Sequence, residues 1–323
     1  MVKRSDFKLV KRPISAIEDD SCLVKVQYMG IEPAMRGWME NRADYIAPLD
    51  LGDVMRGFGA GEVIESNATN FPVGTRVTGS FGWQEYFLHR SDDAPLQIIP
   101  DGVSLDEAIG VFGLTGMTAW FGVNEIGKPK SGDVFVVSSA AGATGSIAGQ
   151  LAKAIGCWVV GITSTDEKCQ WLTDSIGFNA AINYTHEDWP QLLKKACSGG
   201  IDVYFDNAGG DVLDVALDQI SDGARIVLCG GISRYNSTAS QTGPENYFNL
   251  IFRRAKMEGF IVLDYASKFN SAITSMKPLI ASGQLKHKAT ITDGFEALPD
   301  ALISIFEGTN IGKQIVCISP PST

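Results

Sequence analysis

Hydrophobic and polar residues change their spacing abruptly within one stretch of the chain, residues 133–156. Four consecutive apolar residues, 134–137, three of them β-branched, predict a strand that is buried on both faces of a parallel sheet. Apolar residues then recur at helical spacing from Ile147 to Ile155, and Gly156 ends the run. The stretch therefore predicts a buried strand, a glycine-rich turn and a helix in immediate succession.

An alternation of strand and helix patterns continues after this stretch. We expect strands over 158–162, 180–183, 201–205, 224–229 and 259–263, and helices over 165–175, 187–196 and 267–280. Ser164 and Glu167 have the spacing of a capping box for the first of these helices. Because strands that alternate with helices pair in parallel, the pattern predicts an α/β Rossmann fold with a doubly wound parallel sheet.

The first hundred residues carry a different pattern, that of short strands separated by glycine turns. The expected strands lie over 22–29, 57–65, 74–79, 83–88 and 97–100. Ser104 and Glu107 then form a capping box in front of an apolar helical face, and a second helix is expected over 116–125. Near the end of the chain a helix over 295–306 and a last strand are expected, so a β-rich domain accompanies the α/β domain.

The composition is that of a globular protein, with 45% hydrophobic and 20% charged residues, and 323 residues are enough for two domains. A net charge of −10 argues against nucleic acid or an anionic membrane as the main partner, because both bind through clustered Lys and Arg. No stretch predicts a transmembrane helix, and residues 1–13 lack the apolar region of a secretory signal. We therefore expect a cytoplasmic protein.

The six cysteines are scattered, form no C-x-x-C pair and lie in part within apolar runs. This distribution is typical of reduced, mostly buried thiols rather than of disulfides. With only three histidines in the chain, we expect no metal site.

The turn after the strand 134–137 has the pattern of a dinucleotide-binding fingerprint. Ala140, Gly142 and Gly145 occupy the three glycine places of G-x-G-x-x-G, between a strand and a helix as the motif requires. Gly142 lets the backbone approach a pyrophosphate, and the free amides at the start of the helix attract an anion. The glycine-bearing loops that follow the strands 201–205 and 224–229 are further candidates, because ligands bind at the carboxyl ends of parallel strands.

The residues after the second strand favour NADP(H) over NAD(H). A protein that uses NAD commonly places an acidic residue about 20 residues beyond the glycines, for the ribose hydroxyls. This chain has Thr163, Ser164 and Thr165 there, so we expect no carboxylate that would repel a 2′-phosphate, and Lys168 follows one turn into the next helix. A lysine near a helix N-terminus opposes the helix dipole by roughly a few tenths of a kcal/mol, so an anion that pairs with it would explain its position. The alternative is a solvated surface lysine.

Several strings in order make the whole chain resemble the medium-chain dehydrogenase/reductase superfamily. Its zinc-dependent members need a cysteine after the first long strand and a GHE motif, whereas here VKVQYMGIEPAMRGW contains no Cys or His and GFGAGE contains no His. The strings PAMRGWM, AAGATGSIAGQLAK, GFNAAINY, IDVYFDNAGG, LCGGISRYN, RRAKMEGFIVLD and TNIGKQIV resemble the zinc-independent branch. That branch contains prostaglandin reductases, leukotriene hydroxydehydrogenases and plant alkenal double-bond reductases.

The resemblance implies a GroES-like domain over 1–111, a Rossmann NADP-binding domain over 112–286 and a tail over 287–323 that returns to the first domain. By analogy it also implies a homodimer. Lys168 and Tyr184 would hold the 2′-phosphate of NADP(H). The other residues that the resemblance places around the cofactor are Gly142, Ala143, Thr144, Gly145, Asn207, Cys229, Gly230, Ile232, Tyr235, Phe260, Ile261, Val262 and Asn310.

The implied chemistry is hydride transfer from NADPH to the β-carbon of an α,β-unsaturated aldehyde or ketone. Tyr235 matches the family's candidate for the hydrogen-bond donor to the carbonyl oxygen, where negative charge develops. The chain departs from the family pattern at Ala34, where a tyrosine usually precedes Met-Arg, so we expect a wider or less polar substrate pocket. It also begins without the strand that relatives commonly carry upstream of Phe7. The alternatives are a quinone reductase of the same superfamily and an NADPH-binding sensor with weak catalysis.

Overall fold

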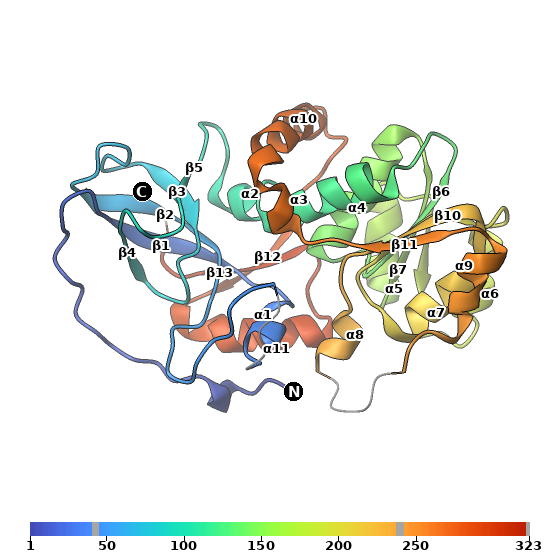
Figure 1. Ribbon diagram of the computed structural model, residues 1–323, viewed down its shortest axis with the longest axis horizontal. Coiled ribbons are helices and arrows are strands. Elements are labelled where there is room, and N and C mark those ends of the chain that lie inside the picture. The colour runs from blue at the N-terminus through green and yellow to red at the C-terminus, as the bar shows by residue number, and fades with distance from the viewer. Residues whose placement is uncertain (41–44, 237–241, 321–323) are drawn as a thin grey trace. The chain divides into compact units, whose positions relative to one another are not determined.

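A computed structural model describes residues 1–40, 45–236 and 242–320 and divides into two compact units (Figure 1). One unit is formed by Met1–Gly113 together with Ala289–Thr323, and the other by Leu114–Lys288. The two ends of the chain therefore fold together, and the α/β part is inserted between them.

The unit of residues 114–288 is built on a six-stranded sheet whose neighbouring strands are all parallel. The strand order is β11-β10-β9-β6-β7-β8, so the chain starts in the middle at β6, adds two strands on one side and then three on the other. This order defines the doubly wound dinucleotide-binding sheet, and it confirms the predicted fold class. The strands are β6 (Val134–Ser138), β7 (Trp158–Thr163), β8 (Ala180–Asn183), β9 (Ile201–Asp206), β10 (Ile220–Leu228) and β11 (Lys256–Gly259).

Helices cover this sheet, as Figure 1 shows. The central strand β6 is apolar and fully buried at Phe135, Val136 and Val137, which is the burial expected of a strand between two helical layers. The helical segments of this unit are α3 (Leu114–Phe121), η2 (Gly122–Gly127), α4 (Ala143–Ile155), α5 (Asp166–Gln170), η3 (Trp171–Ser175), α6 (Trp189–Ala196), α7 (Gly210–Asp218), α8 (Ile232–Tyr235), η4 (Glu245–Phe248), α9 (Asn249–Phe252), η5 (Val262–Lys268) and α10 (Phe269–Ala281).

The other unit contains a seven-stranded sheet in the order β12-β13-β1-β2-β3-β5, with β4 also paired to β1. All pairs are antiparallel except β12 with β13. Its elements are η1 (Arg4–Asp6), β1 (Cys22–Gly30), α1 (Met35–Trp38), β2 (Gly59–Ser66), β3 (Arg76–Gly79), β4 (Tyr86–His89), β5 (Gln97–Ile98), α2 (Leu105–Ile109), β12 (Ala289–Asp293), η6 (Phe295–Ala297), α11 (Leu298–Glu307) and β13 (Lys313–Cys317). Since β13 lies beside β1, the last strand completes a sheet begun by the first.

Helix capping agrees with the sequence at one predicted position and differs at another. At the start of α2, the Ser104 hydroxyl accepts from the Glu107 amide and the Glu107 carboxylate accepts from the Ser104 amide, so this capping box is confirmed. The box predicted at Ser164 is wrong, because Thr165 caps α5 and its hydroxyl accepts from the Lys168 amide at 3.2 Å. Thr165 has the extended backbone that an N-cap needs.

Besides several short helical turns that were not predicted, three elements differ from the sequence prediction. The sixth strand was expected over 259–263, but β11 ends at Gly259 and the helical turn η5 begins at Val262. The reason is that β11 is an edge strand with exposed Lys256, so its own residues are half polar and the apolar run follows it. The helix α7 and the strand β12 were not predicted. None of the helices in the described ranges is long and apolar enough to cross a membrane.

Candidate functional site

The glycine-rich turn between β6 and α4 has the geometry that its sequence requires. Ser139 has a positive φ of 47°, and its carbonyl oxygen accepts from the Gly142 amide at 2.9 Å. A Cβ atom on Gly145 would lie 2.5 Å from that oxygen, and one on Gly142 would lie 3.1 Å from it. Glycine at 145 is therefore a steric requirement of the turn, since any side chain there would push α4 away from β6.

The first turn of α4 presents backbone amides that have no partner within the helix. The Ser146 amide is the first to bond inside it, to the Gly142 carbonyl at 3.0 Å, so the preceding amides of Ala143, Thr144 and Gly145 point out of the N-terminus. Gly142, Ala143 and Thr144 are partly exposed. A helix N-terminus of this kind binds phosphate oxygens through its amides and its dipole.

Lys168 lies in α5, directly after the second strand of the parallel sheet, and only 8% of its surface is exposed. Burial lowers the pKa of Lys168, and the neighbouring Glu167 carboxylate raises it in part. A solvated surface lysine would be exposed, so the alternative interpretation of this residue is wrong. A desolvated ammonium group is stabilised by an anion, which suits it to a phosphate.

Tyr184 follows β8 and is exposed, at 41%. Thr163 at the end of β7 pairs with Asn183 at the end of β8, and the Tyr184 amide donates to the Thr163 carbonyl at 3.0 Å. The Asn183 amide group also donates to the Asp166 carboxylate at 2.8 Å, which joins the end of β8 to the start of α5. The structure therefore brings the two predicted 2′-phosphate residues, Lys168 and Tyr184, onto adjoining segments.

A buried carboxylate organises the loop after β9. Asp206 is 1% exposed, and its Oδ1 accepts from the Ser138 hydroxyl at 2.9 Å and the Tyr204 hydroxyl at 3.0 Å. Both its oxygens also accept from the Gly209 amide, at 3.0 and 3.2 Å. Burial raises the pKa of Asp206, and these hydrogen bonds lower it in part. This carboxylate fixes the backbone of the loop that carries Asn207.

Asn207 is held on both sides by the ends of neighbouring strands. Its side-chain amide donates to the Ser138 carbonyl at 2.8 Å, and its backbone carbonyl accepts from the Ile232 amide at 3.1 Å. The Cys229 and Gly230 amides donate to the Asp206 carbonyl at 2.9 and 3.0 Å. The carboxyl ends of β6, β9 and β10 are thus tied into one surface, as the predicted site requires.

The sequence suggested that Tyr235 lies in a loop, but in the structure it is the last residue of the short helix α8. Its hydroxyl accepts from the Gly231 amide at 3.3 Å, and a Cβ atom on Gly230 would lie 3.3 Å from the same oxygen. The side chain therefore folds back over the glycines that end β10. The hydroxyl of a neutral phenol can both accept and donate hydrogen bonds.

Cys229 is placed beside the same loop, and its thiol is not a candidate nucleophile. Burial raises the pKa of Cys229 to about 12, and the nearby Asp206 carboxylate adds to the rise. A thiol with such a pKa stays protonated near neutral pH, so it contributes packing rather than reactivity.

The segment after β11 packs against the start of the unit. A Cβ atom on Gly122 would lie 2.6 Å from the Phe205 ring and 2.9 Å from the Phe260 ring, so glycine is required for this close approach. Ile261 and Val262 are partly exposed. The contact places residues 260–262 near the end of β9, which carries the loop of Asn207.

Two predicted residues belong to the other unit. The Asn310 side chain donates to the Gly312 carbonyl at 2.9 Å, which makes it part of the turn before β13. Ala34 stands at the N-cap of α1 and is partly exposed.

Sequence reasoning missed four residues around these loops, namely Ser138, Tyr204, Asp206 and Asp166. Ser138 and Asp206 are each the last residue of a largely apolar strand. A polar residue at the end of such a strand could have been recognised from the sequence, because it needs hydrogen-bond partners when it is buried. Within the described ranges, no group of three or more His, Cys, Asp and Glu side chains is arranged to hold a metal ion.

The residues present fit a phosphorylated dinucleotide. The cradle at Gly142 and Gly145 excludes side chains, the first turn of α4 directs amides outward, and Lys168 supplies a desolvated cation. The glycine cradle and the amides of α4 suit a pyrophosphate, and Lys168 suits a 2′-phosphate. The first two follow the first strand of the parallel sheet and Lys168 follows the second, which is the order found in doubly wound dinucleotide-binding folds.

Comparison with known proteins agrees with this geometry. Residues 1–98 match a family described as the N-terminal domain of oxidoreductase, and residues 143–277 match one described as zinc-binding dehydrogenase. The chain is 38% identical to the NADP-dependent 2-alkenal reductase of Nicotiana tabacum over 299 residues, which cover 92% of this chain and 87% of the relative. It is 35% identical to prostaglandin reductase 1 of Bos taurus over 316 residues, 97% of this chain and 94% of the relative.

A solved structure has the same fold over nearly the whole length. CurA from Vibrio vulnificus, in complex with NADPH, is 37% identical and superimposes with a TM-score of 0.92, covering 97% of this chain and 94% of that one.

A doubly wound sheet with an anion-binding turn, inserted in an antiparallel domain, defines a two-domain dinucleotide-dependent oxidoreductase. The chain belongs to the medium-chain dehydrogenase/reductase family, in its zinc-independent branch. It is an NADP-dependent oxidoreductase, and its cofactor is NADP(H).

Proposed function

We propose that this protein reduces the carbon–carbon double bond of α,β-unsaturated aldehydes or ketones with NADPH. The observation that carries the proposal is the Tyr235 hydroxyl, folded over the glycines at the end of β10 beside the fixed loop of Asn207. Relatives named 2-alkenal reductase, prostaglandin reductase 1 and (+)-pulegone reductase, at 34–38% identity, support the substrate class.

NADPH, when held by the residues assigned below, would supply the hydride that the substrate's β-carbon accepts. Two electrons then move through the conjugated system and negative charge gathers on the carbonyl oxygen. Tyr235 donates a hydrogen bond to that oxygen and so stabilises the enolate. A proton from water or from Tyr235 completes the saturated product at the α-carbon.

The other residues of 114–288 position the cofactor. We assign the pyrophosphate to the amides of Gly142, Ala143, Thr144 and Gly145, and the 2′-phosphate to Lys168 and Tyr184. The remaining contacts are assigned to Asn207, Cys229, Gly230, Ile232, Phe260, Ile261, Val262 and, from the other unit, Asn310. Asp206 acts through the loop that it holds, and we regard it as a positioning residue.

The proposal is tested by following NADPH absorbance with simple alkenals, cyclic enones and quinones, for the wild type and for Tyr235→Phe. We expect turnover of the enones and a fall in kcat of about 100-fold in the variant, the usual cost of one oxyanion donor. Full enone activity in the variant would remove Tyr235 from the reaction. Quinone-dependent NADPH loss without enone turnover would indicate a quinone reductase, and tight NADPH binding with no turnover would indicate a sensor.

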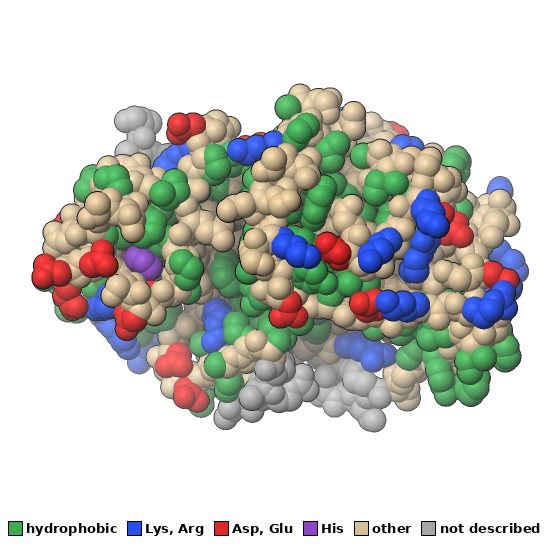
Figure 2. Space-filling model, turned by 45° about the horizontal axis from the view of Figure 1, so that its top comes forward, with side chains coloured by type: hydrophobic (Ala, Val, Ile, Leu, Met, Phe, Trp, Pro, Cys, Tyr) green, Lys and Arg blue, Asp and Glu red, His purple; other side chains and the backbone are tan. Residues whose placement is uncertain are grey.

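We also propose that the protein is a homodimer in the cytoplasm. Four exposed apolar side chains lie together in η4 and α9, next along the chain to the edge strand β11: Tyr247, Phe248, Ile251 and Phe252. Figure 2 shows hydrophobic side chains gathered at the end of the molecule where Figure 1 places α7 and α9. All six cysteines lie in the described ranges as free thiols, which suits a reducing compartment.

Light scattering tests the oligomeric state. A dimer has about twice the chain's 34.7 kDa, and Ile251→Glu is expected to shift the mass toward the monomer, because a buried charge opposes an apolar interface. A wild type that scatters as a monomer at all concentrations would contradict this proposal.

A further inference from the structure

A carboxylate stands two residues before Lys168, the residue to which we assign the 2′-phosphate. Asp166 opens α5, and its side chain is exposed, at 75%. The sequence alone predicts no carboxylate that would repel a 2′-phosphate, yet a negative charge this close to Lys168 would do so. Its presence therefore conflicts with NADPH unless something sets the direction of the carboxylate.

Two residues at the end of β8 engage this carboxylate. The Asn183 side-chain amide donates to Asp166 Oδ1 at 2.8 Å, and His186 Nε2 lies 3.3 Å from the same oxygen. These contacts come from the segment after the neighbouring strand, so they draw the carboxylate toward β8.

The direction of the Asn183 amide is fixed by its other contacts. Its Oδ1 accepts from the Thr185 amide at 3.0 Å and from the Thr185 hydroxyl at 2.7 Å. Since Oδ1 is used in this turn, Nδ2 faces Asp166, and it also lies 3.3 Å from His186 Nε2, so the three side chains form one cluster. Asn183 is also 8% exposed, whereas the His186 side chain is 48% exposed and can be replaced without opening the core.

We propose that Asn183 and His186 are specificity-determining residues for the coenzyme, because they hold the Asp166 carboxylate away from the 2′-phosphate. The inference rests on the proposed placement of the 2′-phosphate at Lys168 and Tyr184. When His186 is removed, the carboxylate is free to approach that phosphate and repel it.

The test is a double-mutant cycle on binding, with dissociation constants for NADPH and NADH measured by titration calorimetry. His186→Ala is expected to weaken NADPH binding about threefold, the scale of an exposed side-chain pair, and to leave NADH binding within about twofold of the wild type. Asp166→Ala is expected to tighten NADPH binding by a similar factor. Adding His186→Ala to Asp166→Ala should then change nothing further.

Two controls accompany the cycle. His186→Gln keeps a hydrogen-bond donor and should keep the wild-type ratio of the two constants. Asp174→Ala removes the same charge from the exposed end of η3 and should leave the ratio unchanged.

The inference is overturned if His186→Ala weakens NADPH and NADH binding equally, or if its effect on NADPH persists in the absence of Asp166. Failure of the underlying assignment has a different signature. If Lys168→Ala weakens both coenzymes equally, the 2′-phosphate is not bound there. If Lys168→Ala is selective for NADPH while His186→Ala is not, only the role of Asn183 and His186 is wrong.

Discussion

Lys168 is a residue whose burial and charge have a direct consequence for coenzyme choice. Lys168 is only 8% exposed, a desolvated ammonium group forms strong charge-assisted hydrogen bonds with phosphate, and the 2′-phosphate is the group that distinguishes NADPH from NADH. The preference for NADPH is therefore expected to depend on this one side chain more than on any other.

We expect Lys168→Ala to raise the dissociation constant of NADPH about 30-fold, which corresponds to ~2 kcal/mol for a charge-assisted hydrogen bond. The constant for NADH should change by no more than about twofold, since NADH has no 2′-phosphate and makes no charge-assisted bond there. Titration of both coenzymes measures this. Lys153→Ala, which removes an exposed lysine from the last turn of α4, is the matched control and should affect neither constant.

The buried Asp206 carboxyl group makes the stability of the protein depend on pH. Burial raises the pKa of Asp206, so the folded protein holds this proton more tightly than the unfolded chain does. Its contribution to stability is fully present below the ordinary Asp pKa of about 3.9, and it is lost as the pH rises through the raised value.

Urea unfolding of the wild type and of Asp206→Asn, over a series of pH values, measures this contribution. The variant is expected to be less stable throughout, because an amide nitrogen in place of one carboxylate oxygen cannot accept from the Gly209 amide. The difference in unfolding free energy should shrink as the pH rises. A difference that grows with pH would mean that folding lowers the pKa of Asp206.

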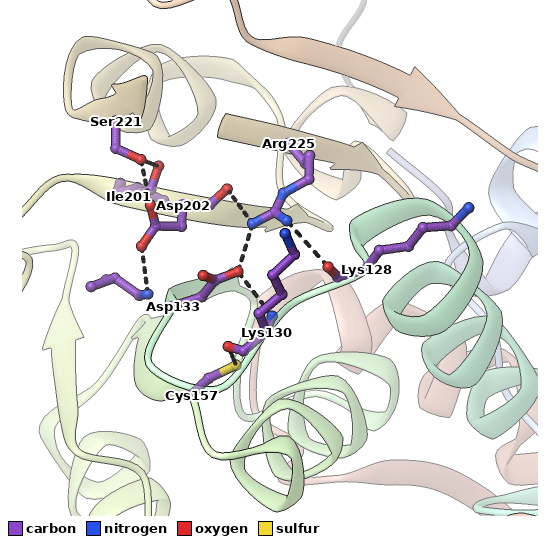
Figure 3. Close-up of polar contacts among 9 residues, drawn as sticks. Lys128, Lys130, Asp133, Cys157, Ile201, Asp202, Ser221 and Arg225 are labelled. Carbon is purple, nitrogen blue, oxygen red and sulfur yellow. Dashed lines mark hydrogen bonds and ion pairs between the residues drawn. The ribbon is translucent and has the colours of Figure 1, made fainter. Parts of the chain in front are cut away.

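At the scale of elements, the parallel sheet is tied at both ends of its strands. The amino ends of β6, β9 and β10 meet in a polar network around Arg225 (Figure 3). Its guanidinium donates to the Asp133 carboxylate at 2.6 Å, the Lys128 carbonyl at 3.1 Å and the Asp202 carbonyl at 3.3 Å. The Asp202 side chain in turn accepts from the Ser221 hydroxyl and the Val134 amide. The proposed cofactor loops lie at the opposite, carboxyl ends of these strands.

Arg225→Met is therefore expected to lower the unfolding free energy by about 2 kcal/mol, because it leaves the partly buried Asp133 carboxylate without its cation. The NADPH dissociation constant should stay within about twofold of the wild type, since a partner lost at the far end of the strands leaves the cofactor loops in place. Arg254→Met, which breaks an exposed pair with Asp222, is the control and should cost little. A large loss of NADPH affinity in Arg225→Met would show that the two ends of the sheet are coupled.

Helices and strands could be predicted from the sequence where the spacing of their own apolar residues and glycines defines them. The buried strands β6 and β7 have apolar runs, β9 has one over 203–205, and the glycines at 142 and 145 define the turn without any tertiary information. The edge strand β11 escaped prediction because an edge is half polar, and the apolar run beside it serves packing of Phe260 against Gly122 instead. The contacts of Asn183 and His186 with Asp166 could not be predicted, because they form only when the ends of β7 and β8 lie side by side in the folded sheet.

At the scale of the whole chain, the unit formed by its two ends depends on a contact between residues far apart in sequence. Lys313 of β13 is 2% exposed, and its ammonium group donates to the Ile31 carbonyl at 3.1 Å and pairs with the Glu32 carboxylate. Glu32 and Ile31 follow β1 and lead to the segment of Ala34. The pair therefore fixes the chain where the departure from the family pattern occurs.

We expect Lys313→Met to lower the unfolding free energy by about 3 kcal/mol, because it leaves the mostly buried Glu32 carboxylate without its cation. Adding Glu32→Gln should recover part of the loss, since the uncompensated charge is then removed. Chemical unfolding of the wild type, the single variant and the double variant measures both effects. A double variant less stable than Lys313→Met alone would contradict the assignment of a paired, buried charge.

The central claim is that hydride goes to the β-carbon of a conjugated double bond and not to the carbonyl carbon. The most direct measurement is to incubate the protein and an α,β-unsaturated ketone with NADPH that carries deuterium at the reactive position of the nicotinamide, and to locate the label by mass spectrometry and NMR. The account predicts a saturated ketone with one deuterium on the β-carbon. An allylic alcohol with deuterium on the carbinol carbon would contradict it.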